Sequence, residues 1–291
     1  MNLDNNKLID LHTHTCYSDG DMMPDELLKE AINKNIKTIS ITDHDTVQGL
    51  QAITYDYKDS INLIPGIELS AKVNHGRMHI LGYGIDIYNE ELNEKTKELK
   101  SNSINSVLSV MEQIKRDYGI IFNYDEIKEL VNTVGNVGRP NLAKLCIKNG
   151  YAKTVQEAFD KYLVPAYEKI RTSNKGLQPK ECIELIIKSG GIPILAHPKS
   201  LELNDKEFLL LLKELISYGL CGIEVYHSSF SKEDTQKYLT IAHDLNLLIS
   251  GGTDYHGKSV KPDIEIGTGK NNNIKIKKLT LLEKIKNGNH N

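Results

Sequence analysis

The 291-residue sequence predicts an α/β protein, built as one barrel or sheet with a helical insertion in the middle of the chain. Short apolar runs alternate with helical patterns near both ends, which is the rhythm of parallel strands joined by crossover helices. The middle of the chain shows helical periodicity without a convincing buried strand. A chain of this length can bury one barrel-sized core beside a smaller insertion.

The first part of the predicted barrel contains four strands. Pro24 suits the first turn of a helix, and Leu27, Leu28, Ala31 and Ile32 then form one apolar stripe. A second, shorter helix is expected after the next strand. The strands are predicted at residues 8–11, 38–41, 63–69 and 78–82.

The helical insertion is predicted at residues 89–176, where Val107, Leu108, Met111 and Ile114 recur at helical spacing. We expect it to form a small domain of its own between two barrel strands. The barrel domain would then consist of residues 1–88 and 177–291.

The alternation of strands and helices returns after the insertion. Strands are predicted at residues 192–196, 222–225 and 247–249, and helices near residues 205–217 and 232–246. Both ends of the chain therefore belong to the same barrel or sheet. The tail after Lys270 is rich in Lys and Asn and has no clear pattern.

The charge of the chain argues against two classes of partner. The formal net charge is −3, with 39% hydrophobic and 26% charged residues. A nucleic-acid coat or a membrane-surface patch needs a dense positive field, so we expect neither duplex DNA nor a membrane as partner. Residues 139–188 are nevertheless locally basic, with ten Lys or Arg against five Asp or Glu, which favours an anionic ligand.

The cysteines and the N-terminus predict a cytoplasmic protein. Residues 1–7 are polar, and the apolar runs are too short for a signal sequence or a membrane span. Cys16, Cys146, Cys182 and Cys221 are scattered without CxxC spacing. The sequence therefore indicates neither a disulfide framework nor a thiolate zinc site.

Two histidines end the first predicted strand, in Asp10-Leu11-His12-Thr13-His14. Side chains two residues apart on a strand face the same way, so His12 and His14 can offer two imidazoles to one metal ion. One carboxylate follows five residues later, and other imidazoles and carboxylates follow or lie on the later strands. They are Asp19, His44, Glu68, His79, His197, Asp254 and His256.

These nine side chains predict a metal centre. Loops converge at the C-terminal rim of an α/β barrel, so ligands distant in sequence can meet there. Nine ligands exceed the needs of one four-coordinate ion, and carboxylates can bridge, so we expect two or three divalent ions. Mixed imidazole and carboxylate ligands suit manganese, iron or zinc.

The same motifs resemble the signature of the PHP family, the polymerase-and-histidinol-phosphatase group of metal-dependent phosphoesterases. The resemblance covers residues 10–20, 42–46, 66–71, 79–86, 196–198 and 252–256. It implies a distorted (β/α)7 barrel, the PHP fold, with a three-metal site. The segment Gly138-Arg139-Pro140-Asn141-Leu142-Ala143 is similar to a motif of the stand-alone branch with a helical insertion, whose members remove phosphate from nucleoside 3′,5′-bisphosphates or trim short RNAs from the 5′ end.

The resemblance also implies how the nine ligands are shared among three ions. One ion would be held by His12, His14, Glu68 and Asp254. A second would be held by Asp19, His44 and His256. Glu68 would bridge to a third, completed by His79 and His197.

The expected reaction is hydrolysis of a phosphoester by a hydroxide held between two ions, which provides a nucleophile at neutral pH. The metals would also neutralise the phosphoryl oxygens as charge moves to the leaving group. We expect Asp254 or a neighbouring ligand to orient the water. Asp45 and His256 are candidates for protonating the leaving oxygen.

Four further side chains are predicted to contact substrate. The planar guanidinium of Arg139 suits a second phosphate, and Lys169 and Arg171 are candidates for the same role. His227, after the predicted strand 222–225, lies at a rim position. We therefore expect a small phosphorylated partner, a nucleotide or a short RNA.

Two alternatives remain open at this point. A histidinol-phosphate phosphatase would use the same ions, but its cationic leaving group would favour acidic surroundings, whereas the insertion is basic. A non-catalytic metal-binding regulatory module would be expected to have lost several ligands, and none of the nine is replaced.

Overall fold

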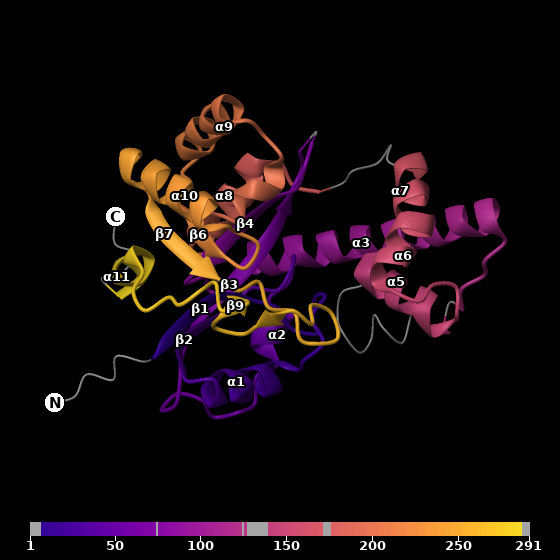
Figure 1. Cartoon of the computed structure of the whole chain (residues 1–291), viewed down its shortest axis with the longest axis horizontal. Helices are drawn as coiled ribbons and strands as arrows, with labels where there is room; N and C mark the ends of the chain where they lie inside the picture. Colours follow the sequence, from indigo (N-terminus) through magenta and orange to yellow (C-terminus); the bar gives the residue numbers. More distant parts are fainter. Residues whose placement is uncertain (1–6, 74, 124, 127–138, 171–175, 287–291) are drawn as a thin grey trace.

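The computed structural model describes residues 7–73, 75–123, 125–126, 139–170 and 176–286 (Figure 1). Seven strands form one barrel-like sheet in chain order, and all seven predicted strands are present. The α/β barrel fold is thereby confirmed. The strands are β1 (Leu8–Thr13), β2 (Ile36–Ile41), β3 (Asn62–Ala71), β4 (Met78–Tyr83), β5 (Ile192–Leu195), β6 (Gly222–His227) and β7 (Leu248–Gly252).

Strand β4 departs from the parallel rhythm, because it pairs antiparallel with both β3 and β5, whereas the other neighbouring pairs are parallel. Only residues 72–77 connect β3 to β4, which is too short for the crossover that a parallel pair needs. The reversal has a consequence for the site. His79, at the start of β4, lies at the same rim as the ends of the parallel strands.

The edges of the sheet, β1 and β7, are joined through side chains and a close backbone approach. The carboxylate of Asp10 accepts hydrogen bonds from the backbone N–H and the hydroxyl of Thr253, at 2.8 and 2.6 Å. A Cβ on Gly252 would lie 2.3 Å from the backbone nitrogen of His12, so only glycine fits there. This seam holds the motif around His12 against the loop that follows β7.

Helices cover the outside of the barrel. The first begins at Pro24, as predicted, and Asn204 and Ser231 cap two later helices by accepting hydrogen bonds from the backbone N–H groups of Glu207 and Asp234. The barrel helices are α1 (Pro24–Asn33), α2 (Gln48–Gln51), α8 (Pro179–Lys188), α9 (Asp205–Ser217) and α10 (Lys232–Asp244). A 3-10 helix (Pro198–Leu201) follows β5, and a small hairpin, β8 (Ile264–Glu265) and β9 (Gly269–Lys270), follows β7.

The tail after Lys270 showed no pattern in the sequence, and its described residues, 271–286, pack against the barrel. Ile274, Ile276 and Leu279 are buried, and the backbone carbonyl of Ile276 accepts a hydrogen bond from the N–H of Ile9 at 2.9 Å. Helix α11 (Thr280–Lys286) follows. The apolar residues are separated by lysines and are too few to show a period, so only the packing reveals their role.

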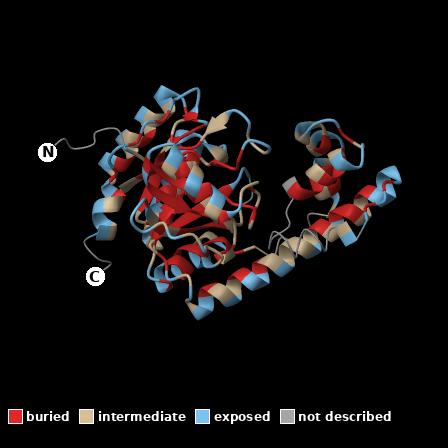
Figure 2. Cartoon of the chain, turned by 90° about the horizontal axis from the view of Figure 1, so that it is seen from below, coloured by how far each residue is buried: buried red, intermediate tan, exposed pale blue. Residues whose placement is uncertain are grey.

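The helical part of the chain has its own apolar cluster, separate from the barrel core (Figure 2). Leu92 and Leu99 of α3 (Glu90–Tyr118) pack in the barrel core, whereas Val107 and Ile114 of the same helix pack in the outer cluster. The remaining helices lie at the far end of α3 in both views: α5 (Arg139–Lys148), α6 (Val155–Ala158), a π-helix (Phe159–Leu163) and α7 (Val164–Ile170). The domain boundaries at residues 89 and 176 stay a prediction, since α3 contributes to both cores.

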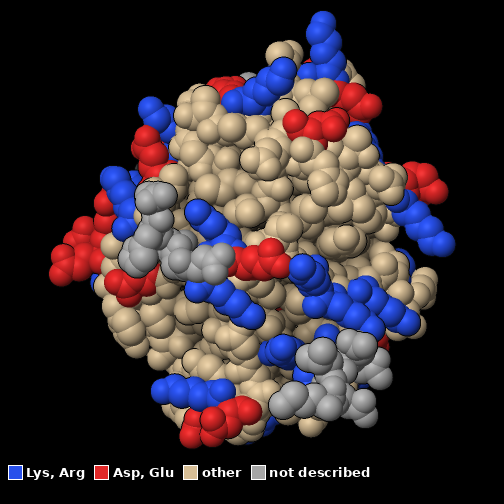
Figure 3. All heavy atoms as spheres, turned by 90° about the vertical axis from the view of Figure 1, so that its left-hand side faces the viewer, with Lys and Arg blue, Asp and Glu red and all other residues tan. Residues whose placement is uncertain are grey.

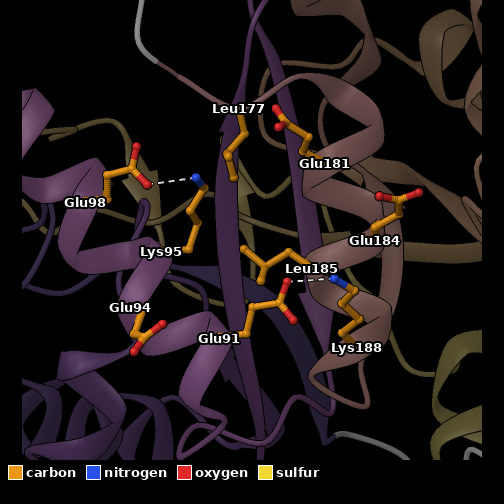
Figure 4. A pocket seen from close by; sticks show the side chains of 9 residues that line it. All are labelled: Glu91, Glu94, Lys95, Glu98, Leu177, Glu181, Glu184, Leu185 and Lys188. Carbon is orange, nitrogen blue, oxygen red and sulfur yellow. Dashed lines mark hydrogen bonds and ion pairs between the residues drawn. The ribbon is translucent and has the colours of Figure 1, made fainter.

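A pocket of about 430 Å³ lies between α3 and α8 (Figure 4). Five glutamates, two lysines and two leucines line it, and two ion pairs cross it or flank it: Glu91 with Lys188 and Lys95 with Glu98, each at 2.7 Å. None of the nine candidate metal ligands is among the lining residues. Because the lining is mainly acidic, it repels phosphate groups.

The surface away from the helical part carries both signs of charge. Figure 3 shows Lys and Arg side chains interspersed with Asp and Glu over the end of the molecule that carries α11. Within the described ranges, every helix is too short or too polar to cross a bilayer.

Candidate metal centre

The structure brings all nine predicted metal ligands together at one rim of the barrel. Their side chains fall into four overlapping groups, and the ligand atoms of each group lie within 4.8 Å of one another. The groups are His14, Asp19, His44 and His256; His12, His14 and Asp254; His12, Glu68 and His197; and His44, Glu68 and His79. The overlap makes them one connected cluster.

Two histidines of this cluster face the same two carboxylates. The Nε2 atoms of His12 and His14 each lie 3.2 Å from Oε2 of Glu68, and 3.5 and 3.3 Å from Oδ1 of Asp254. Ligands bound tetrahedrally at 2.0–2.2 Å from one ion are about 3.3 to 3.6 Å apart. The histidine–carboxylate distances therefore match the spacing of ligands around an ion, while Glu68 and Asp254 fall in different groups of the cluster.

Glu68 lies at the centre of the cluster, fully buried. Its Oε1 is 2.9 Å from Nδ1 of His79 and 2.9 Å from Nε2 of His197, and those two nitrogens are 3.2 Å apart. Its Oε2 faces His12, His14 and His44 instead. The two oxygens thus serve opposite halves of the cluster, which is the arrangement of a bridging carboxylate.

Asp19 anchors the remaining side of the cluster. Its Oδ1 is 3.1 Å from Nε2 of His256, and its Oδ2 is 3.9 Å from Nε2 of His44. Asp19 follows the β1 motif in a turn, whereas His256 follows β7. The loops after the first and last strands therefore meet here, as the resemblance implied.

Two observations test whether metal ions fit these residues. Nε2 of His14 and Oδ1 of Asp19 are buried and make no hydrogen bond of acceptable geometry with the described residues, although oppositely charged atoms crowd around them. Burial by itself would raise the pKa of Glu68, but His44 and His12 hold it well below its usual range. Buried, ionised carboxylates need positive charge beside them, and divalent ions supply it.

The tautomers of His256 and His197 also favour metal binding. Nδ1 of His256 is 2.8 Å from the backbone carbonyl of Asp254, which can only accept, so this nitrogen carries the proton. Nδ1 of His197 is 2.8 Å from the Ser200 hydroxyl, whose own proton goes to the carbonyl of Arg77. In both rings Nε2 is left with a lone pair directed into the cluster, as a metal ligand requires.

Glu224 is a member of the site that sequence reasoning missed. It is fully buried on β6; Oε1 accepts a hydrogen bond from Nδ1 of His12 at 2.9 Å, and Oε2 accepts one from the backbone N–H of His197 at 2.7 Å. It thereby directs Nε2 of His12 into the cluster. The available signal was a single carboxylate in an otherwise apolar strand, between Ile223 and Val225.

We expect Glu224→Gln to weaken metal binding about 10- to 100-fold, the usual cost of losing a carboxylate behind a ligating histidine. Glutamine has one acceptor oxygen, whereas His12 and the N–H of His197 both need an acceptor. Titration calorimetry with manganese measures the loss. Glu94→Gln, on the exposed wall of the α3–α8 pocket, is the matched control and should bind manganese as the parent does; equal affinities in all three proteins would contradict this role.

Two buried aspartates shape the loops around the cluster. Asp43 accepts hydrogen bonds from the backbone N–H of Thr15 at 2.7 Å and from the Ser18 hydroxyl at 2.6 Å, which fixes the turn leading to Asp19. Asp10 likewise fixes the β1–β7 seam, where it also accepts a hydrogen bond from the backbone N–H of Gly267.

Backbone strain marks three of the site residues. Asp45, His197 and Asp254 have φ angles of 53°, 23° and 55°, a region that residues other than glycine seldom adopt. Such conformations persist where the surroundings impose them, and they concentrate at functional sites. Lys261 holds the side chain of Asp254: its Nζ lies 2.6 Å from Oδ2, whereas Oδ1 faces the cluster.

The candidate proton donor Asp45 lies beside the cluster. Its Oδ1 accepts a hydrogen bond from the backbone N–H of Ser70 at 2.8 Å. Burial raises the pKa of Asp45 to about 6, despite that hydrogen bond and the nearby His79. Of the predicted substrate contacts, His227 also reaches the centre, with Nε2 3.4 Å from Oδ2 of Asp254.

The other three predicted substrate contacts come from the helical part of the chain. Lys169 is exposed on α7 and forms an ion pair with Asp117 of α3 at 2.9 Å, rather than a contact with the cluster. Arg139 begins α5, and its side chain lies outside the described part of the chain. Arg171 falls outside the described residues altogether.

The chain is similar to several known proteins. A family model described as the PHP domain matches residues 10–178, more than half of the chain. The 5′-3′ exoribonuclease Rnm of Salmonella typhimurium is 29% identical over 268 residues, covering 89% of this chain and 88% of that protein. The 3′,5′-nucleoside bisphosphate phosphatase of Chromobacterium violaceum is 26% identical over 249 residues, covering 85% and 87%.

A solved structure shares the whole architecture. It is described as an amidohydrolase from Chromobacterium violaceum with bound sulfate and no metal, and it superposes with a TM-score of 0.78 at 26% identity, covering 89% of each chain. Because 89% of this chain is covered, the likeness extends past residue 178, where the matched family model ends.

Proposed function

This chain belongs to the PHP family, and on that premise we propose that it removes a terminal phosphate from nucleoside 3′,5′-bisphosphates or from the 5′ end of short RNA. Like its named relatives, it is a hydrolase of phosphoester bonds. The gathering of nine imidazole and carboxylate ligands around Glu68 is the observation that carries the proposal. The named substrates of two relatives and the basic character of residues 139–188 support the choice of substrate.

Two or three divalent ions bound here, manganese, iron or zinc, would neutralise phosphoryl oxygens and supply a nucleophilic hydroxide at neutral pH. We propose that His12, His14, Glu68 and Asp254 hold one ion. Asp19, His44 and His256 would hold a second. His79 and His197 would hold a third, with Glu68 shared.

The chain itself contributes orientation and exclusion of water. Glu224 holds His12, and Asp10 links β1 to the loop after β7. Lys261 holds Oδ2 of Asp254. Asp254 is therefore placed to orient the attacking water with little rearrangement. Asp45 and His256 stay candidates for protonating the leaving oxygen.

Phosphate release from a panel of substrates tests the proposal. The panel contains a nucleoside 3′,5′-bisphosphate, a nucleoside monophosphate, histidinol phosphate and a short 5′-phosphorylated RNA, each with added manganese. We expect the bisphosphate or the RNA to give the highest kcat/KM. Preference for histidinol phosphate would replace the proposed substrate, and no release from any of the four would refute the proposed function.

We expect Arg139→Ala to raise KM for the bisphosphate about 10- to 100-fold, because one charge-assisted pair of hydrogen bonds to the second phosphate is lost. KM for the monophosphate should stay as it is, since that substrate has no second phosphate. Lys148→Ala is the matched control, at the other end of α5, where Lys148 is exposed and paired with Glu126. An equal loss on both substrates would show that Arg139 does not bind the second phosphate.

A further inference from the structure

His227 is a seventh imidazole at the metal centre, beside the six histidines among the nine candidate ligands, and it lies at the end of β6. Its side chain is more than nine-tenths buried, and its ring centroid lies 5.5 Å from that of His197 and 6.1 Å from that of His12. Nε2 is directed toward Asp254 at 3.4 Å but makes no hydrogen bond with any described residue. A buried polar atom without a partner usually indicates a ligand that completes it.

The protonation of this ring follows from its other nitrogen. The backbone N–H of Ser229 lies 3.1 Å from Nδ1 of His227 and can only donate, so Nδ1 is an acceptor. The Ser229 hydroxyl lies 2.8 Å from the same nitrogen, Nδ1. A neutral imidazole with an unprotonated Nδ1 carries its hydrogen on Nε2. His227 therefore directs an N–H group into the centre.

This arrangement is the reverse of that at the candidate ligands. In His12, His197 and His256 an acceptor holds Nδ1–H, and Nε2 presents a lone pair to the cluster. At His227 a donor holds Nδ1, and Nε2 presents a hydrogen instead. An N–H group cannot ligate a cation, but it can donate to an anion placed between it and the metals.

We propose that His227 is not a metal ligand but a fixed hydrogen-bond donor to a phosphoryl oxygen of the substrate, an inference that rests on the proposed function. Oδ2 of Asp254 lies 3.4 Å from Nε2, and Lys261 already holds this oxygen at 2.6 Å. A phosphoryl oxygen of the substrate carries the negative charge that such a buried donor stabilises.

A pair of substitutions separates the donor from the ring. In His227→Gln the side-chain amide offers an N–H at a position similar to Nε2, whereas His227→Leu fills the same space without a donor. We expect His227→Leu to lower kcat/KM about 10- to 100-fold and the affinity of the manganese-loaded protein for inorganic phosphate about tenfold, and His227→Gln to restore most of both.

Metal content and the tautomer itself provide readouts independent of turnover. Both variants should retain the parent's number of bound ions by elemental analysis after dialysis. In zinc-loaded protein with ¹⁵N-labelled histidine, long-range NMR spectra should show Nδ1 unprotonated and Nε2 protonated for His227, with its signals assigned by their loss in His227→Gln.

Three results would overturn this assignment: loss of an ion in His227→Leu, a protonated Nδ1, or phosphate affinity equal to the parent's. Failure of the proposed function is a different result, because the parent protein would then release phosphate from no member of the panel. If the parent is active and His227→Leu is equally active, the proposed function stands and the role of His227 is refuted.

Discussion

Glu68→Gln is expected to lower kcat on the order of 10³-fold or more, because it removes the one carboxylate that faces both halves of the cluster. Glutamine has the same shape, but it is neutral and has only one oxygen that can ligate. The variant should therefore bind fewer ions than the parent. The checks are kcat on the best substrate of the panel and elemental analysis of the dialysed protein.

The control for Glu68→Gln is again Glu94→Gln, which makes the same substitution on the exposed wall of the α3–α8 pocket. Circular dichroism shows whether each variant keeps its helices and strands. A folded Glu68→Gln protein with the parent's kcat and metal content would disprove the bridging role of this carboxylate.

Removing the metals with a chelator is expected to abolish phosphate release and to lower Tm by about 15 °C. An ion at 1,000 times its dissociation constant adds about 4 kcal/mol to the free energy of unfolding, and two such sites add about twice that. For a chain of this size each kcal/mol corresponds to roughly 2 °C. Without ions, Nε2 of His14 and Oδ1 of Asp19 stay buried without hydrogen bonds, which adds to the cost.

Calorimetry of the chelated and the reloaded protein measures the shift in Tm, and adding back manganese, iron or zinc one at a time shows which ions restore activity. The acidic α3–α8 pocket offers an internal control, because a Glu184→Gln variant should show the same shift as the parent. An unchanged Tm after verified metal removal would mean that the cluster is stable by itself.

Most of the barrel was predictable because strands and helices have different periods. His12 and His14 face the same way for a purely local reason, their spacing of two on a strand. The gathering of distant ligands followed from the geometry of barrel rims. His79 reaches the rim for another reason, the reversal of β4, which depends on the length of the β3–β4 connection and not on the pattern of β4.

The sequence did not reveal the roles that depend on the direction in which a side chain faces. Glu224 resembles any other polar residue in a short strand until the barrel places it inside, beside His12. Lys261 belongs to none of the motifs, yet it holds Asp254. The tautomer of His227 depends on one backbone N–H in the following turn, which no sequence pattern encodes.

Helix α3 is one continuous segment of 29 residues whose two ends are buried in different cores. The outer cluster cannot melt without unwinding the last turns of this helix, and loosening of the barrel face under Leu92 and Leu99 would release its first turns. Unfolding caused by heat or denaturant should therefore spread along α3 from one core to the other. The two parts of the molecule should therefore unfold cooperatively. The hydrogen bonds inside a single helix couple them, rather than an interface between them.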